Sequence, residues 1–230
     1  MNFPFYIHVN LSYLCIAFGA MLLVSFIMNL QTNNFFTLHV FVRKFSMLDL
    51  VSPATALELA TYINGIYALP KQLGEKSIRS LKTNLYLDFL LMPLLYGTIF
   101  LLCMQISMKL PSFGHVLFAS LAWAQIIPWI CDIIENIYLL KKIHPQTIPS
   151  TPSVHAKYQL NGILKWSFSL GAVVCSISLL IYFWLTGEYL YASLYFFLII
   201  ILEIVVFFVL KKVTTKDPKI ILDQYKDIGN

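Results

Sequence analysis

The chain alternates long apolar stretches with short polar segments that are rich in lysine and arginine. A helix needs about 20 residues to cross the hydrocarbon core of a bilayer, and five of the apolar stretches reach that length. They are Leu11–Leu30, Leu85–Met108, Phe113–Leu140, Ile163–Thr186 and Tyr189–Leu210. The pattern predicts an all-α integral membrane protein, a five-helix transmembrane bundle in which residues 1–230 form a single membrane domain.

The basic residues indicate how this bundle is oriented. Of the 16 lysine and arginine residues, all but Lys109 fall between the first and second spans, between the third and fourth spans, or after the fifth. Cytoplasmic loops carry the excess of Lys and Arg in membrane proteins. We therefore expect the N-terminus outside and the C-terminus in the cytoplasm, with residues 213–230 as a cytoplasmic tail.

The segment between the first two predicted spans, residues 31–84, is too long for a simple connection and is expected to be a cytoplasmic loop. Phe35–Leu48 is rich in Phe, Val and Leu with partial alternation, which indicates a strand or an interfacial segment. Further along, Ser52 is the predicted N-cap and Pro53 the first residue of an amphipathic helix near 53–69. The fold of residues 31–52 stays open at this point.

Composition supports a membrane protein and narrows its partners. The chain is 59% hydrophobic and only 12% charged, whereas soluble domains carry about a quarter charged residues. The net charge of +5 does not indicate a nucleic-acid partner, because the basic residues flank apolar segments. Lys76, Arg79 and Lys82 recur just before the second span, where we expect anionic lipid headgroups to be their partners.

Four carboxylates lie inside the predicted spans, namely Asp88, Asp132, Glu135 and Glu203. A charged side chain near the bilayer centre costs roughly 2.5 to 3.5 kcal/mol on insertion scales. Counted from the nearest cytoplasmic lysine at about 1.5 Å per residue, all four lie about 9 to 13 Å deep. Because Lys165 is counted with the loop charges, no basic residue is expected inside the spans to pair with these acids. Shared hydrogen bonds, protonation or a bound cation would then be required.

Neighbouring polar residues extend this acidic layer. On the third span, Asp132, Glu135 and Asn136 are three and four residues apart and share one face. On the second span, Asn84 and Asp88 share a face in the same way. The candidate proton or ion site is therefore Asp88, Asp132, Glu135, Asn136 and Glu203, with Asn84, Tyr96, Pro93 and Pro128 as supporting residues.

The two prolines are included because they interrupt the hydrogen bonds of their helices. Pro93 and Pro128 have no N–H to donate to the carbonyls of Phe89 and Ala124. Each therefore leaves a backbone oxygen near the acids, and we expect a local helix irregularity at both positions. Carbonyl and carboxylate oxygens together favour a cation or shared protons.

Three functions remain open from the sequence. The leading hypothesis is a buried acidic site for a proton or small cation, serving transport or ion-coupled sensing, and the small number of helices favours a homo-oligomer. The second is a membrane-embedded enzyme that modifies a lipid, with the acids holding a metal or acting as general acid and base. The third is a noncatalytic scaffold subunit whose acids only lock the helices together. No sequence motif identifies a cofactor, and the four cysteines form no CxxC pair.

One local pattern resembles known proteins. Asp88 is followed by Pro93 and Tyr96 on the second span, and Asp132 is followed by Glu135 and Asn136 on the third. This pair of segments is similar to a pattern in bacterial multi-pass membrane proteins that have no established activity. The resemblance covers only the central hairpin. It implies a bacterial inner membrane, and it groups Asp88, Asp132, Glu135 and Asn136 as one unit without implying a substrate.

Overall fold

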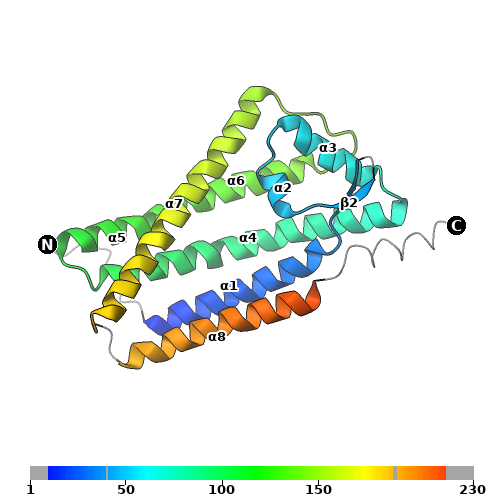
Figure 1. The fold of residues 1–230 in the computed structure, drawn as a ribbon. Coiled ribbons are helices and arrows are strands. Elements are labelled where there is room, and N and C mark those ends of the chain that lie inside the picture. The colour runs from blue at the N-terminus through cyan, green and yellow to red at the C-terminus, as the bar shows by residue number, and fades with distance from the viewer. Residues whose placement is uncertain (1–9, 40, 189–190, 216–230) are drawn as a thin grey trace. The chain divides into compact units, whose positions relative to one another are not determined.

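The computed structural model describes residues 10–39, 41–188 and 191–215 and is mostly helical (Figure 1). Its helices and its two short strands follow one another in the order α1 Leu11–Thr32, β1 Phe36–Leu38, β2 Val42–Lys44, α2 Met47–Val51, α3 Ala56–Tyr67, α4 Lys71–Ser107, α5 Ser112–Ala124, α6 Ile126–Lys142, α7 Pro152–Leu185 and α8 Tyr191–Thr214.

Four helical segments among the described residues are long and apolar enough to cross a membrane, as expected of a membrane protein. They are Leu11–Thr32, Lys71–Ser107, Ser112–Lys142 and Pro152–Leu185. The fifth predicted span overlaps α8, in which the side chains of residues 191–194 lie outside the described part of the chain. Of the predicted cytoplasmic tail, residues 216–230 also lie outside it.

Two helices begin earlier than hydropathy predicts. α4 begins at Lys71, so residues 71–84 of the expected loop are helical, and α7 begins at Pro152 instead of near Ile163. Hydropathy locates the part of a helix that fits the bilayer, whereas the backbone hydrogen bonds can continue into polar sequence. Pro152 also fits the first helical position, where a missing N–H costs nothing. Polar residues of both helices are thereby fixed in register with the apolar spans.

The third span is divided into two helices. α5 ends at Ala124, α6 begins at Ile126, and the N–H of Gln125 between them is bonded to the carbonyl of Ala122 at 3.1 Å. The break precedes Pro128, which cannot donate to Ala124 as a continuous helix would require. The predicted irregularity is therefore present at Pro128. At Pro93, in contrast, α4 continues without interruption.

The segment between α1 and α4 is folded. β1 and β2 form an antiparallel hairpin in which Phe36 pairs with Lys44 and Leu38 pairs with Val42. Of the two alternatives for Phe35–Leu48, the strand is therefore the one found. A single strand would lack a partner for its backbone groups, and here the same segment supplies it.

The predicted N-cap of the next helix is wrong. Ser52 is the C-cap of α2, and the N-cap of α3 is Thr55, whose Oγ1 accepts a 3.1 Å hydrogen bond from the N–H of Glu58. The carboxylate of Glu58 in turn accepts from the N–H of Ala54 at 2.8 Å. A Thr followed three residues later by Glu is a strong N-terminal signal. Pro53 disfavours the helical conformation at Ser52, whose φ is −126° and ψ is 54°, and α2 ends there.

By its internal contacts the chain divides into two compact units. The first unit contains Met1–Leu23, Leu91–Cys131 and Leu164–Phe207, and the second contains Val24–Leu90, Asp132–Ile163 and Phe208–Asn230. The hairpin, α2 and α3 therefore belong to the second unit, together with the first part of α4.

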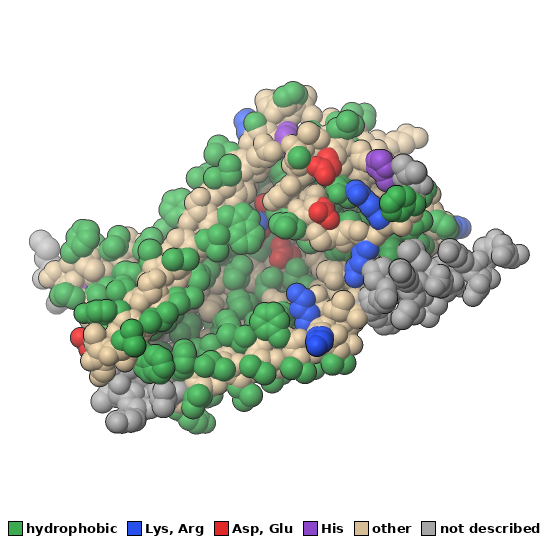
Figure 2. All heavy atoms as spheres, in the orientation of Figure 1, with side chains coloured by type: hydrophobic (Ala, Val, Ile, Leu, Met, Phe, Trp, Pro, Cys, Tyr) green, Lys and Arg blue, Asp and Glu red, His purple; other side chains and the backbone are tan. Residues whose placement is uncertain are grey.

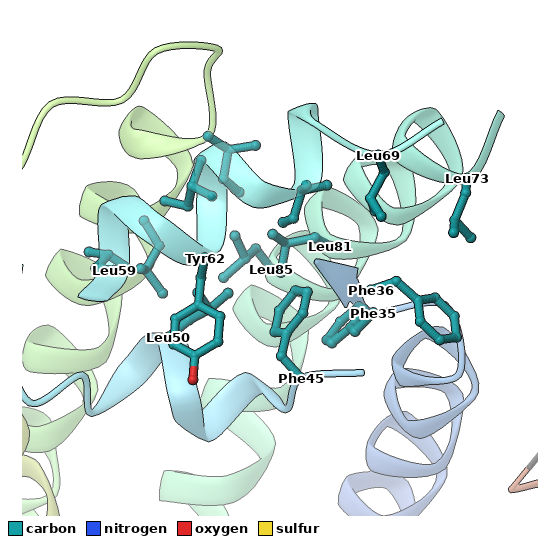
Figure 3. Close-up of a cluster of buried hydrophobic side chains, with 14 of the residues drawn as sticks. Phe35, Phe36, Phe45, Leu50, Leu59, Tyr62, Leu69, Leu73, Leu81 and Leu85 are labelled. Carbon is teal, nitrogen blue, oxygen red and sulfur yellow. The ribbon is translucent and has the colours of Figure 1, made fainter. Parts of the chain in front are cut away.

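A hydrophobic core fills the second unit (Figure 3). The rings of Phe35 and Phe45 stack at 5.3 Å between centroids, and Leu81 and Leu85 of α4 are fully buried in the same cluster. Each such side chain contributes about 1.5 to 3 kcal/mol when it leaves water. We call residues 33–69 of this unit, which contain the hairpin, α2 and α3, the loop subdomain. Figure 2 shows charged side chains and histidines over α2, α3 and β2, and mostly hydrophobic side chains over α7 and α8.

Close backbone contacts tighten the loop subdomain. Thr37 donates a 2.9 Å hydrogen bond to the carbonyl of Tyr62. A Cβ added at Gly65 would meet the hydroxyl of Thr37 and the carbonyl of Leu38, so α3 approaches β1 closely only because residue 65 is glycine. The connector after α6 is also bound to α3, because the amide of Asn64 makes two hydrogen bonds with the backbone of Thr147.

Candidate functional site

The clearest polar contact in the second unit joins α4 to α6. Nδ2 of Asn136 donates a 2.7 Å hydrogen bond to Oδ2 of Asp88 and lies 3.5 Å from the carbonyl oxygen of Leu85. Asn136 is 1% exposed, and Asp88 is partly buried. A hydrogen bond to a carboxylate is stronger than one between neutral groups. The contact therefore fixes the register of the two helices at this level.

Two further carboxylates are buried on α6 in the same unit. Asp132 is 7% exposed and Glu135 is 2% exposed. Their spacing places them on the face of α6 that carries Asn136. We refer to Asp88, Asp132, Glu135 and Asn136 as the acidic cluster. Charges with so little access to water depend strongly on nearby charges and protons.

Tyr158 of α7 belongs to the surroundings of this cluster and was missed by the sequence analysis. It is within electrostatic reach of Glu135 and Asp132, and its hydroxyl donates a 3.1 Å hydrogen bond to the backbone carbonyl of Leu50 in α2. Its ring also packs against Tyr138 of α6 at 4.8 Å between centroids. Tyr158 thus contacts the loop subdomain and lies near the acids. The helix-compatible start at Pro152 was the only sequence signal that could have placed it.

Asn84, a predicted supporting residue, interacts with α1. Its Nδ2 donates a 3.0 Å hydrogen bond to the carbonyl of Met28, and the residue is 2% exposed. Its Oδ1 is buried and accepts no hydrogen bond. A buried amide oxygen of this kind can accept a proton donor or coordinate a hard cation.

Glu203 lies in the first unit, where its described neighbours are on α1. Cβ of an alanine at Gly19 would lie only 2.7 Å from Oε1 of Glu203, so the carboxylate occupies space that the glycine leaves. Oε2 is buried and has no hydrogen-bond partner. Tyr96, Pro93 and Pro128 also belong to the first unit. These four candidates are therefore described separately from the acidic cluster.

Lys165 corrects the charge assignment made from the sequence. It lies inside α7, not in the preceding connector, and it is 7% exposed. Its ammonium is 5.6 Å from the centroid of the Trp166 ring. The expectation that no basic residue lies within the apolar spans is therefore wrong. Lysine is almost never fully buried unless it is paired, so this ammonium is part of the internal electrostatics of the protein.

Within the described part of the chain, no group of three or more His, Cys, Asp or Glu side chains is arranged to hold a metal ion. The acidic cluster offers carboxylate and amide groups that can exchange a proton or coordinate a small monovalent cation through few ligands.

No family model matches this chain, and no curated protein or solved structure matches it either.

Proposed function

We propose that this protein is an ion-coupled sensor or transporter subunit in which the acidic cluster exchanges a proton or a small cation. The proposal includes five transmembrane helices in a bacterial inner membrane, with the N-terminus outside, the C-terminus in the cytoplasm and assembly into a homo-oligomer. Hydropathy supports the number of spans, and the one-sided distribution of basic residues supports their orientation.

The observation that carries the proposal is the hydrogen bond between Asn136 and Asp88, made on a face of α6 that also buries two further carboxylates. Asn136 bonds Asp88 at 2.7 Å, and Asp132 and Glu135 are buried on the same helix. Charged groups in a region of low dielectric constant interact much more strongly than they do in water. The gain or loss of one positive charge therefore changes the energy of the whole cluster. Such groups inside membrane helices commonly mark ion or proton pathways.

Sensing is favoured over simple transport by the link to the loop subdomain. Tyr158 lies within electrostatic reach of Asp132 and Glu135 and is hydrogen-bonded to the backbone of Leu50. A change of charge at the acids alters the orientation that is preferred by the Tyr158 hydroxyl. The hydrogen bond then transmits this change to α2. Ion binding is thereby converted into a change in the stability of the loop subdomain.

A scaffold role is the second candidate, and exposed apolar side chains favour it. Phe41, Leu48 and Leu57 of the loop subdomain are 62–70% exposed. Apolar side chains at such positions suit a protein or membrane partner. In this alternative, neutralising the acids would leave function intact, whereas replacing these three residues by serine would abolish assembly.

Thermal unfolding of the detergent-purified protein tests the ion site. The midpoint is measured in NaCl, KCl and choline chloride, each at pH 5.5 and pH 7.5, for the wild type, Asp132→Asn and Glu135→Gln. A bound ion at 100 times its dissociation constant stabilises by about 2.7 kcal/mol, which corresponds to roughly 5 to 10 °C at this size. In the wild type we expect the melting midpoint to shift by this amount either with one of the two cations or between the two pH values. The two variants should show no such shift.

The matched control is Glu75→Gln, because Glu75 is an exposed carboxylate on α4. This variant should keep the ion response of the wild type. Identical responses in the wild type and in both cluster variants would contradict the proposed function.

A further inference from the structure

The N-terminal part of α4 carries a shallow pocket that is separate from the acidic cluster. It has a volume of about 380 Å³ and is lined by Glu75, Ile78, Arg79, Lys82, Thr83 and Tyr86. All six residues belong to one helix and to the second unit. Two cations, one carboxylate, one hydroxyl and one phenol thus line a single open depression on the surface of α4.

The pocket lies where α4 changes from charged to apolar sequence. Lys82 is the last basic residue of the helix, and between Leu85 and Ser107 the only charged residue is Asp88. Asp88 is engaged by Asn136 of α6. In the membrane arrangement proposed above, the pocket therefore lies at the level of α4 at which a bilayer changes from headgroups to acyl chains.

An exposed apolar track continues from the pocket along the same helix face. Tyr86 is 63% exposed, and Leu90, four residues further on, is 55% exposed. Residues three or four apart are neighbours on a helix surface, so Arg79, Tyr86 and Leu90 follow one line. Tyrosine is enriched at membrane interfaces because its ring is apolar and its hydroxyl is polar.

We propose that this pocket is a binding site for one anionic phospholipid. Arg79 and Lys82 bind the phosphate, which suits the planar guanidinium fork of arginine and the point charge of lysine. The Thr83 hydroxyl donates to a headgroup oxygen, and one acyl chain lies along Tyr86 and Leu90. The ligand is thus a phosphate diester joined to a hydrocarbon chain. This lipid site does not depend on the proposed ion site.

Glu75 makes the site selective in a way that can be measured. Its carboxylate lines the same pocket and opposes the two cations, so the lining carries a net charge of +1. Glu75→Gln therefore removes a repulsion and should strengthen the binding of an anionic lipid. Arg79→Ala with Lys82→Ala should weaken it, since each basic group near a membrane surface contributes about fivefold in affinity.

Native mass spectrometry of the full-length, detergent-solubilised protein tests the site. The protein is titrated with dioleoylphosphatidylglycerol or dioleoylphosphatidylcholine, and the retained lipid is counted. We expect the wild type to retain dioleoylphosphatidylglycerol at least tenfold better than dioleoylphosphatidylcholine. The Arg79→Ala/Lys82→Ala variant should lose this preference, and Glu75→Gln should increase it.

Two matched variants separate the pocket from general charge. Lys71→Ala removes one exposed cation of the same helix outside the pocket and should keep the preference. Arg79→Lys/Lys82→Arg keeps the charge and should also keep the preference, and a double alanine variant that melts at the wild-type temperature shows that its loss of preference is not a folding defect. An equal preference in the wild type and the double alanine variant would overturn the proposal. Binding of inorganic phosphate as tight as that of the lipid would also overturn it, because the acyl chain would then contribute nothing.

Discussion

Asn136 of α6 donates a 2.7 Å hydrogen bond to the carboxylate of Asp88 on α4. These residues are 48 positions apart in the chain, and the bond couples two helices inside the second unit. Leucine at position 136 would fill a similar volume but could not donate. Asn136→Leu should therefore lower the free energy of unfolding by about 1 to 3 kcal/mol, because the carboxylate loses this donor.

Thermal or denaturant unfolding of the purified protein measures this loss. Gln72→Leu, at an exposed position of α4, is the control for adding a leucine and should change stability by less than about 0.5 kcal/mol. A stability of Asn136→Leu equal to that of the control would show that the bond does not hold α4 and α6 together.

Tyr158→Phe tests the link between α7 and the loop subdomain. The substitution removes the hydroxyl that bonds the carbonyl of Leu50 and keeps the ring that packs on Tyr138. We expect the free energy of unfolding to fall by about 1 kcal/mol and hydrogen exchange in α2 to become faster. Tyr195→Phe, at an exposed tyrosine of α8, should change neither quantity. Unchanged exchange in α2 of Tyr158→Phe would remove the proposed path from the acids to the loop subdomain.

Glycine substitutions at two helical positions should have opposite effects. Ala at position 65 would place Cβ against the Thr37 hydroxyl and the Leu38 backbone, so Gly65→Ala must separate α3 from β1. It should destabilise by about 1 to 3 kcal/mol. At Gly171 an added Cβ would meet nothing within 4 Å apart from its chain neighbours and the backbone of its own helix, and alanine is the better helix former by about 1 kcal/mol. Gly171→Ala should therefore raise the free energy of unfolding. If Gly65→Ala raised it as well, the close packing of α3 on β1 would be contradicted.

The pH dependence of stability should report on Lys44 in β2. Burial lowers the pKa of Lys44 from its ordinary value of 10.5. Between the lowered pKa and 10.5 the unfolded chain binds more protons than the folded protein, so this group makes stability rise with pH. Lys44→Met removes this partly buried charge and should therefore be more stable than the wild type at pH 7.

The advantage of Lys44→Met should narrow as the pH approaches 10.5, since the wild-type lysine then loses its proton. Melting midpoints measured from pH 7 to pH 10.5 test this, with Lys71→Met as the exposed control. A difference that stays constant over this range would show that burial of Lys44 has no electrostatic cost.

Hydropathy predicted the four apolar spans that the described residues show, but it did not predict where α4 and α7 begin. Residues 71–84 and 152–162 are polar and carry no membrane signal, yet they extend α4 and α7. This extension contains Tyr158 and places it near the acids, and this position does not follow from the composition of the segment. The position of Tyr158 is fixed by tertiary packing, because its hydroxyl bonds the backbone of Leu50 in the loop subdomain.

Short-range spacing predicted the local geometry of the acidic residues and not their distant partners. The steps of three and four residues placed Asp132, Glu135 and Asn136 on one face of α6, and all three are buried. Depth counting grouped Glu203 with them, whereas its described neighbours lie on α1. Depth along a helix axis fixes neither the side that a residue faces nor the helix that it contacts.

Hydrogen–deuterium exchange of α2, residues Met47–Val51, tests most directly whether the acidic cluster controls the loop subdomain. Exchange is measured in the wild type and in Glu135→Gln. If a cation shifts the melting midpoint, exchange is compared with and without that cation; if protons do, it is compared at pH 5.5 and pH 7.5. We expect exchange in α2 of the wild type to change several-fold with the ion and exchange in Glu135→Gln to stay constant. An ion-dependent change of equal size in both proteins, or none in the wild type, would contradict the account.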